Sequence, residues 1–529
     1  MADDLVLTGA MLIGAERVTG TGKPIHGVDP RSGETLEPAY GMAELKDVER
    51  AAVLAAEAFD SYRHTTPAER AAFLDTVANN IDAIAETLVP RVIAETGIAE
   101  PRVRGELART TNQLRLFASV VREGSWVGAR VDPALPDRTP LPRPDIRQRK
   151  VPVGPVAVFG ASNFPLAFSV AGGDTASALA AGAPVVVKAH NAHPGTSELV
   201  GTAIRCAVAE HGLHQGVFSL IFGDGATIGT ALVSDPRIQA VGFTGSRSGG
   251  LAIAAAAAAR PVPIPVYAEM SSVNPVFVLP AAAAARGAEL GKAYVGSLTT
   301  GVGQLCTNPG LVFVVDGPGA DEFVASAAQA IADSDAGPML NAGIQSAYVN
   351  GVQRLADSPE VTEAASGRAN DDIAAVGRTR LFATSGAAFK ANPDLREEIF
   401  GPASLVIRVD NVEEFEAIID TMEGQLTATV HAEPDDHATA ANLLRTLEPK
   451  VGRILFNGWP TGVEVGHAMV HGGPFPATSD SRTTSVGTLA IERFLRPVAY
   501  QNVPVELLPA EIDEANSLGI PRRVDGQRP

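Results

Sequence analysis

The sequence predicts an α/β protein with a Rossmann-type parallel sheet and a second α/β region. Short apolar strand segments alternate with helical segments from residue 151 to about residue 244, which is the pattern of a parallel sheet covered by helices on both faces. A similar mixture follows from about residue 274 to residue 479. The length of 529 residues exceeds the roughly 250–300 residues at which a single hydrophobic core stops growing. We therefore expect at least two domains.

The composition argues against three kinds of partner. A formal net charge of −18 disfavours nucleic-acid binding, which needs a basic face. The apolar stretches are shorter than the about 20 residues that span a bilayer, and residues 1–4 carry acids where a signal peptide carries basic residues. The two cysteines, Cys206 and Cys306, do not belong to a Cys/His cluster, so no metal site is predicted. We expect a soluble, cytoplasmic protein.

The N-terminal part is predicted to be mainly helical. Thr66 and Glu69 form a capping box with Pro67 at the first helical position, and apolar residues then recur at helical spacing. Pro90 is expected to kink or divide this helix, because proline lacks the N–H of an interior helical residue. A further helix is predicted from residue 102 to about residue 121.

Residues 132–150 interrupt the helical pattern. They are rich in proline and cannot form a regular helix, so they are predicted to be a linker or an extended excursion from the main body. Alternating apolar residues at 498–503 predict a late strand.

The most regular alternation begins at residue 151. The predicted strands cover residues 156–159, 184–188, 217–221 and 240–243, and the predicted helices cover residues 169–181, 195–211 and 226–233. Glycine-containing turns follow three of the strands, at residues 160–165, 223–229 and 243–250. Glycine lets the backbone approach a pyrophosphate, and the next helix offers free N–H groups. None of the turns has the G-x-G-x-x-G spacing, so they are either simple turns or parts of a nucleotide site.

Three residues in this framework are candidates for chemistry. Cys306 lies in the turn-like string 303–310, where backbone N–H groups would favour a thiolate; the alternative is a buried, inert cysteine. Glu269 ends an apolar strand. It is either a general base in a partly dry site or a carboxylate at a solvated strand end. Asn163 is either an oxyanion donor or a turn former. Cys206 has the helical spacing of a core residue.

Taken together, these motifs resemble the aldehyde dehydrogenase superfamily over about residues 25–505. The strings that carry the resemblance are 163–165 (Asn-Phe-Pro), 243–246 (Phe-Thr-Gly-Ser), 303–306 (Gly-Gln-Leu-Cys) and 397–402 (Glu-Glu-Ile-Phe-Gly-Pro). The resemblance implies that Cys306 is the nucleophile, Glu269 the general base and Asn163 an oxyanion donor. It also implies a set of residues that contact the cofactor: Lys188, Gly245, Ser246, Glu398 and Phe400.

The resemblance implies a domain organisation as well. The cofactor-binding domain would comprise residues 1–131 and 151–273, and the catalytic domain residues 274–480. A small β oligomerisation element would comprise residues 132–150 and 481–510, followed by a C-terminal tail at 511–529. A homodimer or homotetramer is expected.

NADP is the expected cofactor, with NAD tolerated. NAD-preferring relatives often place a glutamate three residues after the ribose lysine, whereas this chain has Asn191. A carboxylate there would repel a 2′-phosphate, and an amide can donate a hydrogen bond to it. Arg247 either adds positive charge near the same turn or faces solvent.

The expectation for the substrate rests on two stretches of the sequence, residues 162–181 and 470–478. They resemble a bacterial branch of the family that holds 2,5-dioxovalerate dehydrogenases and an NADP-dependent fatty-aldehyde dehydrogenase. A dicarboxylate-derived aldehyde needs a cation for its distal carboxylate, for which Arg109 and Arg115 are candidates; a long-chain aldehyde would prefer apolar residues such as Phe117 and Phe168. The preferred prediction is oxidation of 2,5-dioxovalerate to 2-oxoglutarate, with a fatty or other aliphatic aldehyde as the alternative substrate.

The expected mechanism passes through a thioester on Cys306, which forms after hydride loss to the nicotinamide and is hydrolysed by water that Glu269 activates. Either His467 or His471 assists proton transfer, or both are structural. A non-redox alternative is a cysteine-dependent hydrolase that uses Cys306, Glu269 and a histidine.

Overall fold

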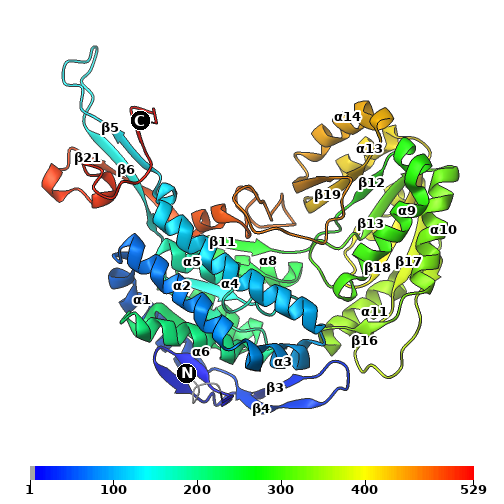
Figure 1. Ribbon diagram of the computed structural model, residues 1–529, viewed down its shortest axis with the longest axis horizontal. Coiled ribbons are helices and arrows are strands. Elements are labelled where there is room, and N and C mark those ends of the chain that lie inside the picture. Colours follow the sequence, from blue (N-terminus) through cyan, green and yellow to red (C-terminus); the bar gives the residue numbers. More distant parts are fainter. Residues whose placement is uncertain (1–5, 529) are drawn as a thin grey trace.

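The computed structural model describes residues 6–528, which form two α/β bodies side by side (Figure 1). Residues 1–4, on which the signal-peptide prediction rests, lie outside the described residues. Within the described range, no helix has both the length and the apolar character needed to cross a membrane.

The first body is built on a seven-stranded sheet in the order β11-β10-β7-β8-β9-β1-β2. Its parallel strands are β7 (Val156–Phe159), β8 (Val185–Lys188), β9 (Phe218–Ile221), β10 (Ala240–Thr244) and β11 (Val266–Glu269). The antiparallel edge is formed by β1 (Met11–Ile13) and β2 (Glu16–Val18). Four central strands carry buried residues at every position of residues 156–158, 185–187, 218–221 and 240–242, as expected for a sheet covered on both faces.

Two helical layers cover this sheet. On one side lie α1 (Leu45–Arg63), α7 (Thr230–Ser234) and α8 (Arg247–Ala258), and on the other lie α5 (Gly173–Ala181) and α6 (Pro194–Glu210). An outer layer packs on α5 and α6 and consists of α2 (Pro67–Ala83), α3 (Ala85–Thr96) and α4 (Glu100–Glu123). The carboxyl ends of β7, β8 and β10 therefore lie along one edge, which is where parallel sheets bind ligands.

The second body is built on a sheet in the order β15-β17-β18-β13-β12-β19-β20. The strands are β12 (Val276–Val278), β13 (Leu311–Val315), β15 (Thr362–Ser366), β17 (Arg380–Ser385), β18 (Ala403–Val409), β19 (Gln425–His431) and β20 (Val451–Phe456), of which β15 is antiparallel to its neighbour. The helices are α9 (Pro280–Thr299), α10 (Pro318–Ala332), α11 (Ala342–Ala356), α12 (Gly386–Ala391), α13 (Glu413–Thr421) and α14 (His437–Leu447). Val276 and Val278 pack with α9 and α10, whereas Phe277 packs with the opposite core, following the two-residue period of a strand.

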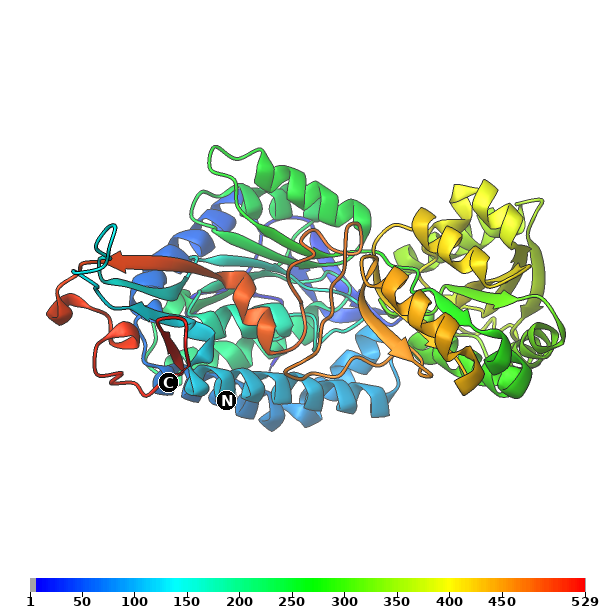
Figure 2. The ribbon, with the colours of Figure 1, turned by 90° about the horizontal axis from the view of Figure 1, so that it is seen from above.

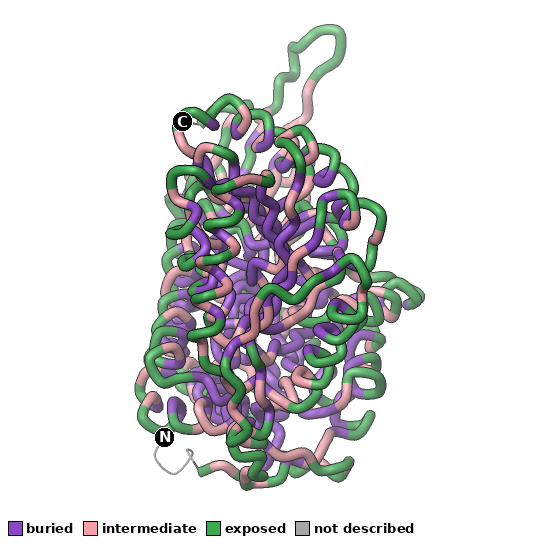
Figure 3. The backbone as a smooth tube through the Cα atoms, turned by 90° about the vertical axis from the view of Figure 1, so that its right-hand side faces the viewer, coloured by how far each residue is buried: buried purple, intermediate pink, exposed green. Residues whose placement is uncertain are grey.

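A four-stranded sheet, β21-β6-β5-β22, projects from the first body (Figures 1 and 2). It contains β5 (Ala129–Asp132), β6 (Ile146–Pro152), β21 (Leu495–Gln501) and β22 (Arg522–Val524). The mostly exposed loop 133–145 extends beyond it (Figure 3). The proline-rich segment is therefore an excursion, and the late strand is β21. Two small ribbons complete the described strands: β3 (Pro24–Val28) with β4 (Thr35–Gly41), and β14 (Gly337–Pro338) with β16 (Val376–Gly377).

Some predicted boundaries differ from those in the structure. The break in the N-terminal helix falls at Ile84, whereas Pro90 lies inside α3, beyond its first turn. There the proline removes one interior hydrogen bond without ending the helix. The helix expected from residue 169 begins at Gly173, because Gly172 is extended. Cys206 is partly exposed on α6 rather than buried in the core.

The ends of the predicted oligomerisation element also differ. Residues 488–494 form a 3-10 helix whose Ala490, Ile491 and Phe494 are buried in the core of the first body. The segment 511–529, expected to be a separate tail, contributes β22 to the projecting sheet through parallel pairing with β5. The short strand Arg522–Val524 carries too few apolar residues to be recognised from its pattern.

Candidate active site

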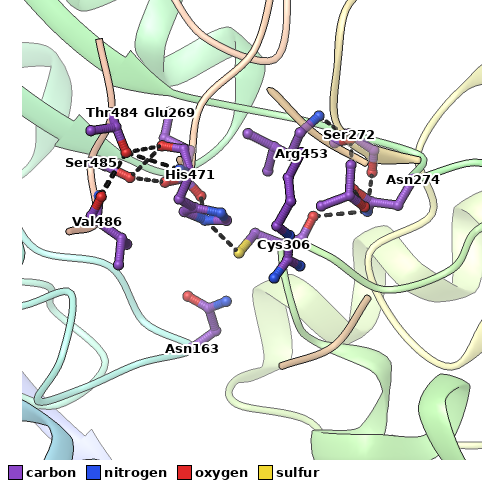
Figure 4. Close-up of polar contacts among 12 residues, drawn as sticks. Asn163, Glu269, Ser272, Asn274, Cys306, Arg453, His471, Thr484, Ser485 and Val486 are labelled. Carbon is purple, nitrogen blue, oxygen red and sulfur yellow. Dashed lines mark hydrogen bonds and ion pairs between the residues drawn. The ribbon is translucent and has the colours of Figure 1, made fainter. Parts of the chain in front are cut away.

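The candidate site lies where the carboxyl end of β11 faces the second body (Figure 4). Glu269 is the last residue of β11 and is 3% exposed, so the alternative of a solvated strand end is wrong. Cys306 is half-buried in a turn, as expected from its sequence. Asn163 lies in the loop after β7 and is buried. Figure 4 shows the Glu269 and Asn163 side chains on either side of the Cys306 sulfur.

A continuous series of polar contacts runs from the sulfur into the protein. Cys306 Sγ is 3.3 Å from His471 Nε2, and the same nitrogen is 2.9 Å from Glu269 Oε1. The Ser485 hydroxyl donates a hydrogen bond of 2.8 Å to Glu269 Oε2. The ligand atoms of Cys306, Glu269 and His471 lie within 4.8 Å of one another, so a metal ion could sit there only by displacing these contacts. The arrangement provides a route for a proton between the thiol and the carboxylate.

His471 is held beside Glu269 by a returning segment of the chain. Residues 477–479 pair with the end of β11: Met270 N–H donates to Ala477 O at 2.8 Å, and Ser479 N–H donates to Ala268 O at 3.0 Å. The His471 N–H donates to the Thr484 hydroxyl at 2.9 Å. Because these backbone contacts fix both sides of the pair, the imidazole has little freedom to leave the carboxylate.

The environment sets opposite protonation tendencies for the two ends of this series. Burial raises the pKa of the Cys306 thiol well above its ordinary value, the Glu269 charge raises it further, and Arg109 opposes both effects. Burial alone would raise the pKa of Glu269, but the charge of His471 and hydrogen bonds from His471, Ser485 and Cys306 bring it below its ordinary value. At neutral pH the thiol is therefore protonated and the carboxylate ionised, so thiolate formation needs a nearby proton acceptor.

The turn that carries Cys306 is fixed by backbone constraints. Gly303 has φ +65°, and an added Cβ would lie 2.3 Å from the backbone of Gly401, so only glycine fits there. The Asn274 amide donates hydrogen bonds of 2.9 Å to Cys306 O and to Asn308 O. The Asn274 oxygen accepts from the Ser272 hydroxyl at 2.9 Å. This network connects residues 272–274 to the turn that carries the nucleophile.

The Asn163 amide faces the same turn. Its Nδ2 donates a hydrogen bond of 3.1 Å to Gln304 O, and the Arg102 guanidinium donates one of 2.8 Å to Asn163 O. One Nδ2 proton is therefore engaged and the second is available for another acceptor. The placement fits an oxyanion donor, and the two hydrogen bonds tie the loop after β7 to Gln304 and to Arg102.

Lys188 and Asn191, two of the predicted cofactor contacts, follow β8. Burial lowers the pKa of Lys188 to about 8, with Asp224 opposing the shift, and the ammonium has no ion pair with any described residue. The Asn191 Oδ1 is buried without a hydrogen-bond partner among residues 6–528. A half-buried cation and an unpaired amide oxygen at a carboxyl edge fit the hydroxyl and phosphate groups of a nucleotide ribose.

The other predicted cofactor contacts occupy two places. Gly245 and Ser246 follow β10, and the Ser246 hydroxyl caps α8 by accepting from Gly249 N–H at 3.2 Å. Glu398 and Phe400 line a cavity beside the Cys306 turn, together with Ser272. Burial raises the pKa of Glu398 to about 8. These two groups are thus brought to the sheet edge and to the nucleophile, as the two ends of a dinucleotide require.

Several other predicted candidates lie away from the site. Arg115 forms an ion pair of 2.7 Å with Asp82. Arg247 forms one of 2.8 Å with Glu423, so its charge is already engaged. His467 is exposed, which leaves His471 as the histidine at the nucleophile.

Sequence reasoning missed Ser485 and Asn274. Neither lies in a motif with a spacing of its own, and each meets its partner across more than 30 residues of chain: Ser485 contacts Glu269 and Asn274 contacts Cys306. The positive φ of 46° at Asn274 is compatible with asparagine, but asparagine is too common in turns to have singled it out.

Residues 18–475 match the model of the aldehyde dehydrogenase family. The chain is 57% identical over 522 residues to alpha-ketoglutaric semialdehyde dehydrogenase 2 of Azospirillum brasilense, covering 98% of this chain and 99% of the relative. It is 47% identical over 518 residues to alpha-ketoglutaric semialdehyde dehydrogenase of Acinetobacter baylyi, covering 98% of each. The predicted family and branch are confirmed.

Solved structures confirm the predicted fold. Aldehyde dehydrogenase C from Pseudomonas syringae, in complex with NAD+ and octanal, superposes with a TM-score of 0.79 at 22% identity, covering 94% of this chain and 97% of that chain. Lactaldehyde dehydrogenase from Escherichia coli superposes with a TM-score of 0.80 at 23% identity, covering 93% and 98%.

Proposed function

The chain belongs to the aldehyde dehydrogenase family, and we propose that it oxidises 2,5-dioxovalerate, also called α-ketoglutarate semialdehyde, to 2-oxoglutarate with NADP as the hydride acceptor. The names of the two relatives described above support this substrate. The observation that carries the proposal is the contact series in which His471 Nε2 lies 3.3 Å from Cys306 Sγ and 2.9 Å from Glu269 Oε1.

The first step is formation of the nucleophile. The ionised Glu269 carboxylate, which accepts a hydrogen bond from the Cys306 thiol, takes the thiol proton. The Nε2–H of His471 donates to Glu269 Oε1 and lies next to the sulfur, so it holds the carboxylate in place and stabilises the thiolate. The Cys306 thiolate then adds to the aldehyde carbon. The free Nδ2 proton of Asn163 and the Cys306 N–H are the donors available to the developing oxyanion.

When bound, NADP supplies the hydride acceptor, so that oxidation of the adduct leaves a thioester on Cys306. Lys188 and Asn191 would hold its adenosine ribose, and Glu398 its nicotinamide ribose. Glu269, once it has released the thiol proton and is ionised again, removes a proton from the attacking water, and hydrolysis releases the acid and restores the thiolate. Because Glu269 is buried and ionised, it is suited to act as this base.

The preference for NADP rests on Asn191. Its Nδ2 can donate a hydrogen bond to a 2′-phosphate, and its unpaired Oδ1 can accept one from a ribose hydroxyl. An amide therefore tolerates NAD, whereas a carboxylate at this place would repel NADP. Arg247 adds little, since Glu423 neutralises it.

Steady-state kinetics test the proposal. Purified protein is supplied with 2,5-dioxovalerate or decanal, each with NADP or NAD, and the absorbance of the reduced nicotinamide is followed. The highest kcat/KM is expected for 2,5-dioxovalerate with NADP. A higher value for decanal would favour the fatty-aldehyde alternative. Ester hydrolysis without any reduction of nucleotide across these aldehydes would favour a cysteine-dependent hydrolase.

A homodimer or homotetramer is part of the same proposal. The projecting sheet and its surroundings expose large apolar side chains: Leu135, Leu141, Val505 and Leu507 are 42%, 69%, 58% and 69% exposed. Apolar side chains on a protruding sheet are typical of an association surface. Native mass spectrometry should show a dimer or tetramer, and a monomer at micromolar concentration would contradict this part of the proposal.

A further inference from the structure

We propose that Arg109 binds the carboxylate at the far end of the substrate, so that the site selects ω-oxo carboxylic acids over aldehydes with apolar tails. The inference rests on the proposed function, because it names the group that makes 2,5-dioxovalerate preferred. It settles the choice between Arg109 and Arg115, which the sequence alone leaves open.

Arg109 carries an unsatisfied charge near the nucleophile. It lies on α4 and is half-buried, and its Nε and one terminal nitrogen, Nη2, are buried without a hydrogen-bond partner in the described chain. Burying a cation without a partner is costly, and such groups are usually paired. An orphaned guanidinium beside an active site therefore indicates an anionic ligand that completes its hydrogen bonds.

The aromatic neighbours of Arg109 hold it in place without using its N–H groups. Its guanidinium carbon lies 5.7 Å from the ring centre of Phe164 and 5.3 Å from that of Phe168. Cation–π contacts of this kind engage the face of the guanidinium and leave its edge free. Phe168 in turn packs against His471, with ring centres 6.0 Å apart. The free edge is thus positioned next to the residues that surround the nucleophile.

The acidic neighbour on the same helix, Glu106, acts on Arg109 through its charge but forms no ion pair or hydrogen bond with it among the described residues. Glu106 Oε1 accepts hydrogen bonds of 2.8 and 3.0 Å from the backbone N–H groups of Leu166 and Ala167 and so fixes the loop that follows Asn163, while Oε2 has no hydrogen-bond partner in the described chain. The influence of Arg109 on the Cys306 pKa shows that its field reaches the nucleophile.

The other arginines near the site donate to backbone oxygens, and Arg453 leaves a single nitrogen, Nε, buried without a partner in the described chain, whereas Arg109 leaves two. Arg102 donates to Asn163 O at 2.8 Å, and Arg453 donates to Gly462 O and Pro460 O at 2.7 Å each. Two free nitrogens on one planar fork match the two oxygens of a carboxylate. A 2-oxo acid, whose carboxylate and ketone oxygens are adjacent, is the class of tail that such a fork recognises.

The test compares two substrates of equal chain length, 2,5-dioxovalerate and pentanal, which lacks the carboxylate. Arg109→Met keeps an unbranched stem between the phenyl rings but removes the fork, and Arg109→Lys keeps the charge. The matched control is Arg115→Met on the same helix. We expect Arg109→Met to lower the ratio of the two kcat/KM values at least about 100-fold, mainly through the KM for 2,5-dioxovalerate. Arg109→Lys should lower it less, and Arg115→Met should leave it unchanged.

The ratio separates binding of the carboxylate from general damage. Loss of Arg109 also changes the thiol pKa, but that effect acts on both aldehydes alike. An equal loss with both substrates, or an unchanged ratio in both Arg109 variants, would overturn the inference. If the parent enzyme itself prefers pentanal, the proposed function fails instead. Inhibition of pentanal oxidation by added 2-oxoglutarate gives a second readout: it should weaken at least about 10-fold in Arg109→Lys, and equal inhibition of parent and variant would contradict the inference.

Discussion

Replacement of His471 by glutamine tests how the thiolate of Cys306 forms, because His471 lies between Cys306 and Glu269. Glutamine can still donate a hydrogen bond to Glu269, but it cannot carry the positive charge that would stabilise the thiolate. In the parent protein, an imidazolium formed at Nε2 would lie 3.3 Å from the thiolate and 2.9 Å from the carboxylate. At an effective dielectric constant of about 20, a charge pair at 3.3 Å is worth about 5 kcal/mol, which is an upper limit on what the variant loses.

The expected loss in rate is smaller than this limit. General acid–base catalysis by one side chain contributes about 10²- to 10⁴-fold, and His471 supports the base Glu269 only through its charge and its hydrogen bond. We therefore expect His471→Gln to lower kcat/KM by about 100- to 1,000-fold, or about 3 to 4 kcal/mol of activation free energy. Because burial already raises the pKa of Cys306, the variant should hold even less thiolate at neutral pH.

Two assays separate the possible outcomes. The rate of alkylation by iodoacetamide, measured against pH without nucleotide, reports the thiolate directly and should fall at neutral pH in His471→Gln. Steady-state kinetics report the whole reaction. The control is His467→Gln, an exposed histidine in the same segment, which should behave like the parent. If His471→Gln stays within about 3-fold of the parent in both assays, less than the smallest acid–base contribution expected, the proposed route is wrong.

Three further predictions concern neighbouring groups. Ser485→Ala removes a hydrogen bond that lowers the pKa of Glu269; hydrogen bonds to charged groups are worth about 1.5–3 kcal/mol, so the acid limb of kcat should move up by about one to two pH units, and an unmoved limb would exclude this role. The charge of Lys188 is lost as pH rises through its pKa of about 8, so the Kd for NADP should increase above that pH, and Lys188→Met should bind weakly with no such dependence when measured by fluorescence titration. Asn191→Glu places a carboxylate near the 2′-phosphate and should lower kcat/KM at least about 10-fold with NADP but not with NAD; equal effects on both nucleotides would contradict the assigned contact.

The first sheet was predictable because its strands are short, apolar and separated by turn signals. Residues 156–159 and 184–188 contain little besides valine and other apolar residues, which is the composition of strands buried on both faces. β22 was not predictable, since its three residues include two arginines. The break at Ile84 was missed as well, because no helix-breaking residue marks it, whereas the proline that was expected to break the helix lies inside α3.

The candidate site was predictable where residues lie in ordered motifs, as Cys306, Glu269 and Asn163 do. The choice between His467 and His471 was not, because the two are four residues apart in a segment without regular structure. Pairing of residues 477–479 with the end of β11 brings His471, and not His467, next to Glu269. The unpaired nitrogens of Arg109 could not be predicted, because which hydrogen bonds a guanidinium makes depends on contacts between elements far apart in the sequence.

The central claim is that oxidation leaves an acyl group on Cys306 and that Glu269 is needed to remove it. The most direct test mixes Glu269→Gln enzyme with NADP and 2,5-dioxovalerate, quenches with acid, and compares the reduced nicotinamide formed with the mass of the Cys306 peptide. The account predicts a burst of reduced nicotinamide that matches the number of active sites, with the acyl mass retained on Cys306. A burst of the same size with an unmodified Cys306 peptide, or full turnover by Cys306→Ser, would contradict it.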